Sequence, residues 1–274
     1  MVRTGTFLYG TRIINGLHKS DGISVTARGN IYQIKSKGQE HMINSDNINP
    51  EYADIDELLH QGGSLVDTGD ANRLAYLNKG LFVCDAVDPE AVHDYDLTPW
   101  YPDMHMMCIH DEATADFLME DGGFTEKKLC SQWIYTGDNF DLEELLDACD
   151  TEENVTFNRL TSFHVDRVAE LTGESIRYVE NRIRAGALFG MYVGRTLAGF
   201  IGMHEAGSMG MMHVLPRFRG HKLGKLLEAF AINLQLDNGC IPFGHVVEGN
   251  EISEKLQLSL GLTRCEHPAV WIFK

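Results

Sequence analysis

The spacing of apolar residues between positions 155 and 273 constrains the fold most, because it switches repeatedly between the period of a strand and that of a helix. Strands are predicted at 155–160, 188–193, 196–204, 209–215, 241–247 and 269–273. Helices are predicted at 162–171 (capped by Thr161 or Ser162), 176–183, 221–238 and 251–260. This order predicts an α/β (α+β) fold in which helices cover a mixed sheet, and it excludes a doubly wound Rossmann fold.

Charge is distributed unevenly along the 274 residues, whose net charge is −17. Residues 1–150 hold 27 acidic and 10 basic side chains, whereas residues 151–274 hold 13 of each. We therefore predict an acidic first domain at 1–150 and a second domain at 151–274, with the cut in the acidic segment 140–154. So acidic a chain is not expected to bind nucleic acid. The acidic half either keeps the protein soluble or attracts cationic amines over long distances.

The remaining bulk features favour a cytoplasmic protein. No run of about eighteen apolar residues is present, so no membrane span is expected, and the first residues lack the apolar core of a secretory signal. The six cysteines are spread singly, which is typical of reduced thiols. Neither they nor the histidines show the spacing of a metal site, so no metal is expected.

Two segments of the chain resemble each other. Residues 111–135 and 250–273 share a polar turn, a short helix, a glycine and a strand, in that order. Asp111 corresponds to Asn250 at an offset of 139 residues, and Trp133 corresponds to Trp271 at an offset of 138. Two such units can resemble each other by chance. Taken as a repeat, they predict that the first half is a second, degenerate copy of the fold of the second half.

The densest basic cluster lies where the strand ending at position 215 meets the next helix. Four permanent positive charges fall within nine residues, those of Arg217, Arg219, Lys222 and Lys225. Glycines at this junction let backbone N–H groups point outward at the positive end of the helix dipole. The combination predicts a binding site for a pyrophosphate. The patterns of a P-loop and of a dinucleotide-binding fold are both absent.

The stretch 214–227 resembles the cofactor loop of the GNAT superfamily of acyl-CoA N-acyltransferases, whose pattern is V-x-P, two residues, then [Q/R]-x-x-G-x-[G/A] before a helix. The residues that match are Val214, Pro216, Arg219 and Gly224. Lys222 stands where the first glycine of the pattern falls. The stretch 250–262 is similar to the N-x-x-[AS]-x-x-L helix of the same superfamily. In its two-part organisation the chain resembles glycine N-acyltransferase.

The resemblance implies acetyl-CoA, or another acyl-CoA, as cofactor and a primary amine of a small molecule or amino acid as acceptor. The backbone of Val214 and Leu215 would pair with the pantetheine arm and polarise the thioester carbonyl. Asn250 would hydrogen-bond the same arm. The residues that would hold the pyrophosphate are Arg219, Gly220, His221, Lys222, Leu223, Gly224 and Lys225. The corresponding stretch of the first half, 78–103, has no basic cluster, so one active site per chain is expected.

The proposed chemistry calls for a proton acceptor, because an alkyl amine with a pKa of about 10 is almost wholly protonated at pH 7. Candidate bases near the expected cleft are Glu205, His213, His245 and Glu248, and of these we favour His245 and Glu205. In the superfamily a tyrosine of the last helix commonly acts as the acid that protonates the departing thiolate. This chain has Gln257 at that position. A thiol with a pKa of about 8.5 leaves readily as thiolate and depends less on an acid.

Two hypotheses follow. The first is an enzyme that transfers an acetyl or other short acyl group from acyl-CoA to an amine. The alternative is a non-catalytic CoA-binding or interaction module, in which Lys222 and Gln257 would be marks of decay. Release of the coenzyme thiol with a panel of amines distinguishes the two.

Overall fold

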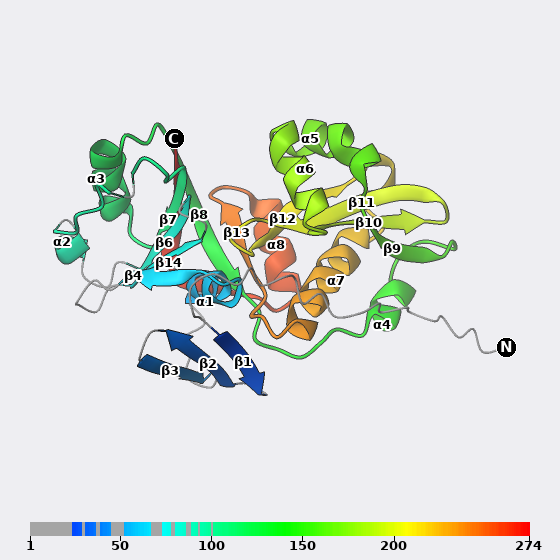
Figure 1. Ribbon diagram of the computed structural model, residues 1–274. Coiled ribbons are helices and arrows are strands. Elements are labelled where there is room, and N and C mark those ends of the chain that lie inside the picture. The colour runs from blue at the N-terminus through cyan, green and yellow to red at the C-terminus, as the bar shows by residue number, and fades with distance from the viewer. Residues whose placement is uncertain are drawn as a thin grey trace. The chain divides into compact units, whose positions relative to one another are not determined.

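The computed structural model of the chain describes the backbone of residues 24–28, 31–36 and 39–44, and it describes residues 52–66, 73–77, 80–85, 89–92, 94–99 and 101–274. The chain divides into two compact units, residues 1–48 and 49–274. The smaller unit contains an antiparallel sheet, drawn in dark blue in Figure 1. Its strands are β1 (Ser24–Arg28), β2 (Ile31–Ser36) and β3 (Gln39–Asn44).

In the described part of the larger unit, eleven strands form one mixed sheet, in the order β4-β5-β6-β7-β14-β8-β13-β12-β11-β10-β9. The first half of the chain supplies β4 (Ser64–Val66), β5 (Arg73–Leu77), β6 (Leu81–Asp85), β7 (Met106–Ile109) and β8 (Glu126–Ile134). The second half supplies β9 (Val155–Arg159), β10 (Leu188–Val193), β11 (Thr196–Met203), β12 (Met209–Val214), β13 (Phe243–Val247) and β14 (Thr263–Phe273).

Helices cover both faces of this sheet. The helices of the described larger unit are α1 (Ala53–His60), α2 (Pro89–Val92), α3 (Glu112–Gly122), α4 (Leu142–Asp147), α5 (Val165–Thr172), α6 (Ile176–Arg184), α7 (Leu223–Asp237) and α8 (Glu251–Ser259). Figure 1 shows α5 and α6 on one face of β10–β12 and α7 on the other. Because both faces are covered, the centre of β11 is buried throughout. None of the helices built from described residues is long and apolar enough to cross a membrane.

The predicted element order of the second half is confirmed, and so is the repeat in the first half. In each half a parallel strand pair is followed by a helix and a strand: β6, β7, α3 and β8 in one, β12, β13, α8 and β14 in the other. Both helices begin alike, since Asp111 accepts a hydrogen bond from the Thr114 amide and Asn250 accepts one from the Ser253 amide. A short side chain that accepts from the third residue of the helix is a common N-cap.

The two repeats exchange their last strands. β14 lies between β7 and β8, and β8 in turn lies between β14 and β13. Residues 49–274 therefore form one compact unit that includes both repeats. The boundary expected at 150/151 lies inside this unit. As a boundary between two repeats it stays a prediction.

Candidate active site

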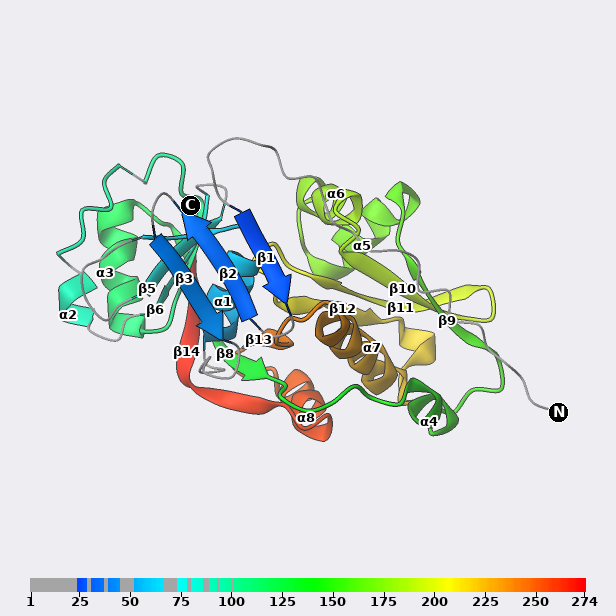
Figure 2. The same cartoon turned by 60° about the horizontal axis from the view of Figure 1, so that its bottom comes forward.

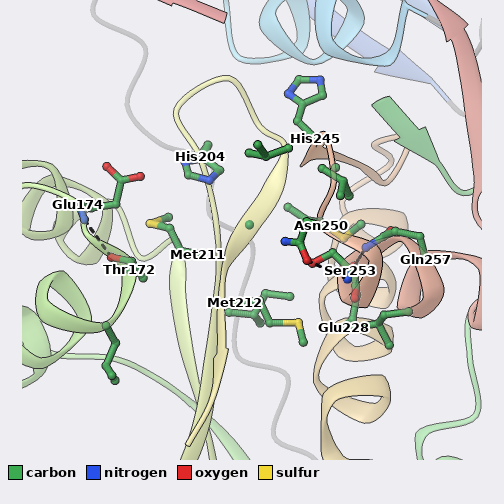
Figure 3. A pocket seen from close by; sticks show the side chains of 18 residues that line it. Thr172, Glu174, His204, Met211, Met212, Glu228, His245, Asn250, Ser253 and Gln257 are labelled. Carbon is green, nitrogen blue, oxygen red and sulfur yellow. Dashed lines mark hydrogen bonds between the residues drawn. The ribbon is translucent and has the colours of Figure 1, made fainter. Parts of the chain in front are cut away.

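The central feature of the site is the divergence of two parallel strands. β12 and β13 pair at one register position, Met209 with Gly244, and no further pair joins them in the described part of the chain. A cavity of about 410 Å³ lies at this divergence. Figure 3 shows that side chains from both sides of β12 line it. Glu174, which follows α5, lies on one side, and Glu228 of α7 and Gln257 of α8 lie on the other. The cavity thus reaches through the sheet.

A bulge in β12 shapes the wall of the cavity. Phe200 pairs with His213 and Gly202 pairs with Gly210, so Met211 and Met212 together stand opposite the one residue between Phe200 and Gly202. Met211 has a φ of 50°, a left-handed conformation that costs a non-glycine residue about 1–2 kcal/mol. A bulge leaves its extra residue outside the hydrogen-bonded ladder. The bulge could not be predicted from the sequence, because no residue type at these positions indicates one.

Five successive amides lie at the start of α7. In the described chain, none of the N–H groups of residues 220–224 donates to a backbone carbonyl. Lys222, the N-cap of α7, has a φ of 60°, and Gly220 has a φ of 84° with no other atom within 4 Å of the space a Cβ would take. Free amides at the positive end of a fifteen-residue helix form a site for an anion.

Two of the predicted cationic residues are held by backbone carbonyls. The Nε of Arg219 donates to the Val214 carbonyl at 2.9 Å, and the Nζ of Lys225 donates to the Ser259 carbonyl at the end of α8 at 2.8 Å. The Leu215 amide donates to the Ala198 carbonyl at 2.8 Å. The predicted contacts of the Val214 carbonyl and the Leu215 amide with a pantetheine arm would therefore compete with these bonds.

The predicted base His245 lines the cavity, as does Asn250. Both ring nitrogens of His245 are engaged. Nδ1 accepts from the Trp271 indole at 3.0 Å, so Nε2 carries the proton and donates to the Gln132 amide oxygen at 2.8 Å. Burial lowers the pKa of His245 to about 4. Action as a base would require the Trp271 bond to open.

The other predicted base, Glu205, is not among the residues that line the cavity, but its neighbour His204 is. The Tyr178 hydroxyl lies 2.8 Å from Nδ1 of His204. Burial, with Arg182 acting in the same direction, lowers the pKa of His204 to about 4. Glu174 lines the same side, and burial raises the pKa of its carboxyl.

The cavity wall formed by α7 and α8 carries a pair of side chains that sequence analysis missed in part. Glu228 and Gln257 are 4% and 5% exposed, and Gln257 Nε2 donates to Glu228 Oε1. The other oxygens, Glu228 Oε2 and Gln257 Oε1, have no hydrogen-bond partner among the described residues. Burial raises the pKa of Glu228 to about 7. The signal in the sequence was a glutamate among apolar residues on the inner face of α7.

One buried cluster next to His245 has the makings of a metal site. Asp54, Cys108 and His245 each place one donor atom within 4.8 Å of the others. The Asp54 oxygens already accept from the His110 ring at 2.8 Å and from the Ile55 amide at 2.9 Å. Since both ring nitrogens of His245 are also engaged, hydrogen bonds already occupy the donor atoms that Asp54 and His245 could offer to a metal. The expected absence of a metal stays a prediction.

Comparison with known proteins yields similarity of structure only. No family model matches the chain, and no curated protein is similar to it in sequence. A Drosophila protein solved by X-ray crystallography shares the fold with a TM-score of 0.51 and 16% identity, over 82% of this chain and 87% of its own.

Two further similar structures have TM-scores below 0.5. One is an acetyltransferase of the GNAT family from Colwellia psychrerythraea, with 18% identity and a TM-score of 0.45, covering 82% of this chain and 94% of its own. Another is a tandem GNAT protein from the clavulanic acid biosynthesis pathway, with 14% identity and a TM-score of 0.41, covering 88% and 81%.

Proposed function

We propose that the chain is a two-part acyltransferase of the GNAT type, and that it transfers an acetyl or other short acyl group from acyl-CoA to a primary amine of a small molecule or amino acid. The observation that carries the proposal is the divergence of β12 and β13. It opens a cavity through the sheet beside the free amides that begin α7.

The donor fits this arrangement from its phosphates to its thioester. The pyrophosphate would bind the amides of residues 220–224, where Arg217, Arg219 and Lys222 are exposed and add positive charge. The pantetheine arm would lie along the diverging strands, where backbone groups lack ladder partners. The thioester would then reach the cavity, where Asn250 and Ser253 of the α8 cap line the same wall.

The bulge at Met211 and Met212 supports a role in polarising the thioester carbonyl. An amide that the bulge releases from the ladder would donate to the oxygen that becomes negative as the amine attacks. Such a donor contributes about 3 kcal/mol to transition-state stabilisation when it is fixed in place. The strained φ of Met211 is consistent with a functional constraint at this point.

The acceptor would enter from the opposite side of the sheet, where Glu174 and His204 line the cavity. The carboxylate of Glu174 would hold the ammonium form of the amine in the mouth of the cavity. Both histidines of the cavity are neutral at pH 7, because burial lowers the pKa of each to about 4. A histidine with a pKa of about 4 is a weak base, so the amine would lose its proton to solvent or to Glu174.

Calorimetric titration with acetyl-CoA tests donor binding. We expect Arg219→Glu to weaken binding by at least about tenfold, because it replaces a cation at the phosphate site with an anion. The matched control is Lys255→Glu, which makes the same charge change at an exposed position on α8. Equal affinity of the wild type and Arg219→Glu, or no binding by the wild type, would contradict the proposed donor site.

Thiol release with a panel of amines tests the reaction itself. Turnover with one class of amines supports the enzyme. Binding of acetyl-CoA without thiol release from any amine would instead favour the non-catalytic module. If the acidic first half steers cationic amines, the second-order rate should fall as salt is added.

A further inference from the structure

Among the buried side-chain atoms of the described residues, two without a hydrogen-bond partner lie side by side on the wall of the cavity. They are Oε2 of Glu228 and Oε1 of Gln257, whose other polar atoms bond to each other. An unpartnered buried carboxyl is costly, so its retention on the wall of a cavity indicates a ligand contact. Figure 3 shows the pair on the α7–α8 side of β12.

We propose that Glu228 is the catalytic acid that protonates the coenzyme sulfur as the thioester breaks, and that Gln257 is its positioning residue. This inference rests on the proposed function and adds a residue and a step to it.

The side of the sheet decides between acid and base. Glu228 lies on the wall that also contains the α8 cap, which is the side of the donor. Glu174 and His204 lie on the other side, where the amine would enter. A group on the donor side is placed to meet the sulfur and not the attacking nitrogen. Gln257 occupies the position where the resemblance places a tyrosine, and it cannot donate a proton as an acid. Its amide instead holds the neighbouring carboxyl.

The surroundings of Glu228 keep its carboxyl protonated near neutral pH. Burial raises its pKa to about 7, and the hydrogen bond from Gln257 opposes this only in part. The other titratable groups on the cavity wall are Glu174, His204 and His245, and the two histidines are neutral at pH 7. Through Gln257, α8 presents an uncharged partner. Among the described residues that line the cavity there is no lysine or arginine to stabilise the carboxylate, so a large share of Glu228 keeps its proton at pH 7.

The step balances as follows. The amine nitrogen forms a bond with the carbonyl carbon, and the carbon–sulfur bond breaks. The sulfur keeps the electron pair and takes the proton from Glu228 Oε2. The carboxylate regains a proton from solvent, which receives the proton that the amine loses. The sum is amine plus acyl thioester giving amide plus free thiol.

Steady-state kinetics of Glu228→Gln with acetyl-CoA and the best amine of the panel test the proposal. The substitution keeps the shape of the side chain and removes its acidic proton. We expect kcat to fall on the order of 100-fold, at the low end for a general acid because a thiolate leaves readily. Calorimetry should show unchanged affinity for acetyl-CoA. The wild-type kcat should decline as the pH rises above about 7, and this decline should vanish in the variant.

Two further variants separate catalysis from structure. Gln257→Leu keeps the acid but removes its positioning bond, so kcat should fall less than in Glu228→Gln while the decline at high pH persists. The exposed residue Glu180 of α6 provides the control Glu180→Gln, which should match the wild type. Infrared spectra give a readout independent of turnover. A carboxylic acid band present in the wild type at pH 6 should be missing from Glu228→Gln.

The outcomes are distinguishable. If the wild type releases no thiol with any amine, the proposed function fails. If the wild type turns over but Glu228→Gln has the same kcat and the same pH profile, the role of Glu228 is overturned and the proposed function stands. Loss of acetyl-CoA affinity in Glu228→Gln would also overturn it, in favour of a binding role.

Discussion

The two parallel strand pairs of the repeats differ in one respect. β6 and β7 pair at four consecutive positions, from Leu81 with Met106 to Cys84 with Ile109, whereas β12 and β13 pair at one. We call β6 and β7 the closed pair and β12 and β13 the open pair. The strands of the closed pair are joined through α2, a helix of four residues, and those of the open pair through α7, a helix of fifteen. β6 is fully buried. The same unit is therefore a packed core in one repeat and the wall of a cavity in the other.

The repeat alone therefore does not make a site. The long helix of the open pair packs against β11 and β12 and presents its free amides beside the gap. The closed pair has no helix of comparable length in the described part of its connection, and its strands stay paired along their length.

Filling the cavity between β12 and β13 should abolish donor binding. Ser253→Trp would place an indole in the cavity from α8, because the Ser253 side chain lines it and only the backbone amide bonds to the Asn250 cap. We expect a loss of acetyl-CoA affinity of at least about 1,000-fold, or about 4 kcal/mol, by calorimetry. The control is Ser259→Trp on the exposed last turn of the same helix. Tight binding by Ser253→Trp would show that the donor does not use this cavity.

Buried charge should respond differently in the two repeats. In the closed repeat Asp54 and His110 satisfy each other at 2.8 Å, whereas Glu228 in the open repeat keeps an oxygen without a partner. Burial raises the pKa of Glu228 from an ordinary 4.5 to about 7, so the folded state binds its proton more tightly than the unfolded state. The Glu228 contribution to stability is therefore full below pH 4.5 and is lost as the pH rises through 7.

Urea unfolding at several pH values measures this effect. Between pH 4.5 and pH 8 the free energy of unfolding of Glu228→Gln should rise relative to that of the wild type, by up to about 3 kcal/mol. Glu180→Gln, the exposed control, should follow the wild type at every pH. If the difference in the free energy of unfolding between Glu228→Gln and the wild type does not change with pH, burial does not raise the pKa of Glu228.

The smallest effect concerns the backbone at the start of α7. Lys222 holds a φ of 60°, which glycine adopts without strain. Lys222→Gly should therefore raise the free energy of unfolding by about 1 kcal/mol. Lys222→Ala, which keeps the strain and removes the same charge, should not. If both variants have the same stability, the left-handed turn is not strained in the wild type.

Much of the fold could be predicted from the sequence, because local signals determine it. The apolar periods from Val155 to Phe273 reflect side chains that face a sheet or a helix, and the structure places every predicted element of the second half. The capped helix and glycine of the repeat were also visible, since Asp111 and Asn250 act through their immediate neighbours.

Features that depend on contacts between distant residues could not be predicted. The exchange of β8 and β14 depends on the pairing of strands more than a hundred residues apart. Similarly, Lys225 was expected at the phosphate, but its Nζ donates to the Ser259 carbonyl at the end of α8. His245 carries the right chemistry in the sequence, and only the fold brings Trp271 and Gln132 to its two nitrogens.

The exchanged strands have a consequence for biosynthesis. β8 is made early, yet on one edge it pairs with β14, which follows it by more than a hundred residues. Neither repeat can complete its sheet until Thr263–Phe273 has left the ribosome. During translation the first repeat therefore exposes an open β8 edge, a template for unwanted pairing with other chains. We expect a nascent chain of this design to depend on chaperones or fast synthesis more than a chain whose halves close one after the other.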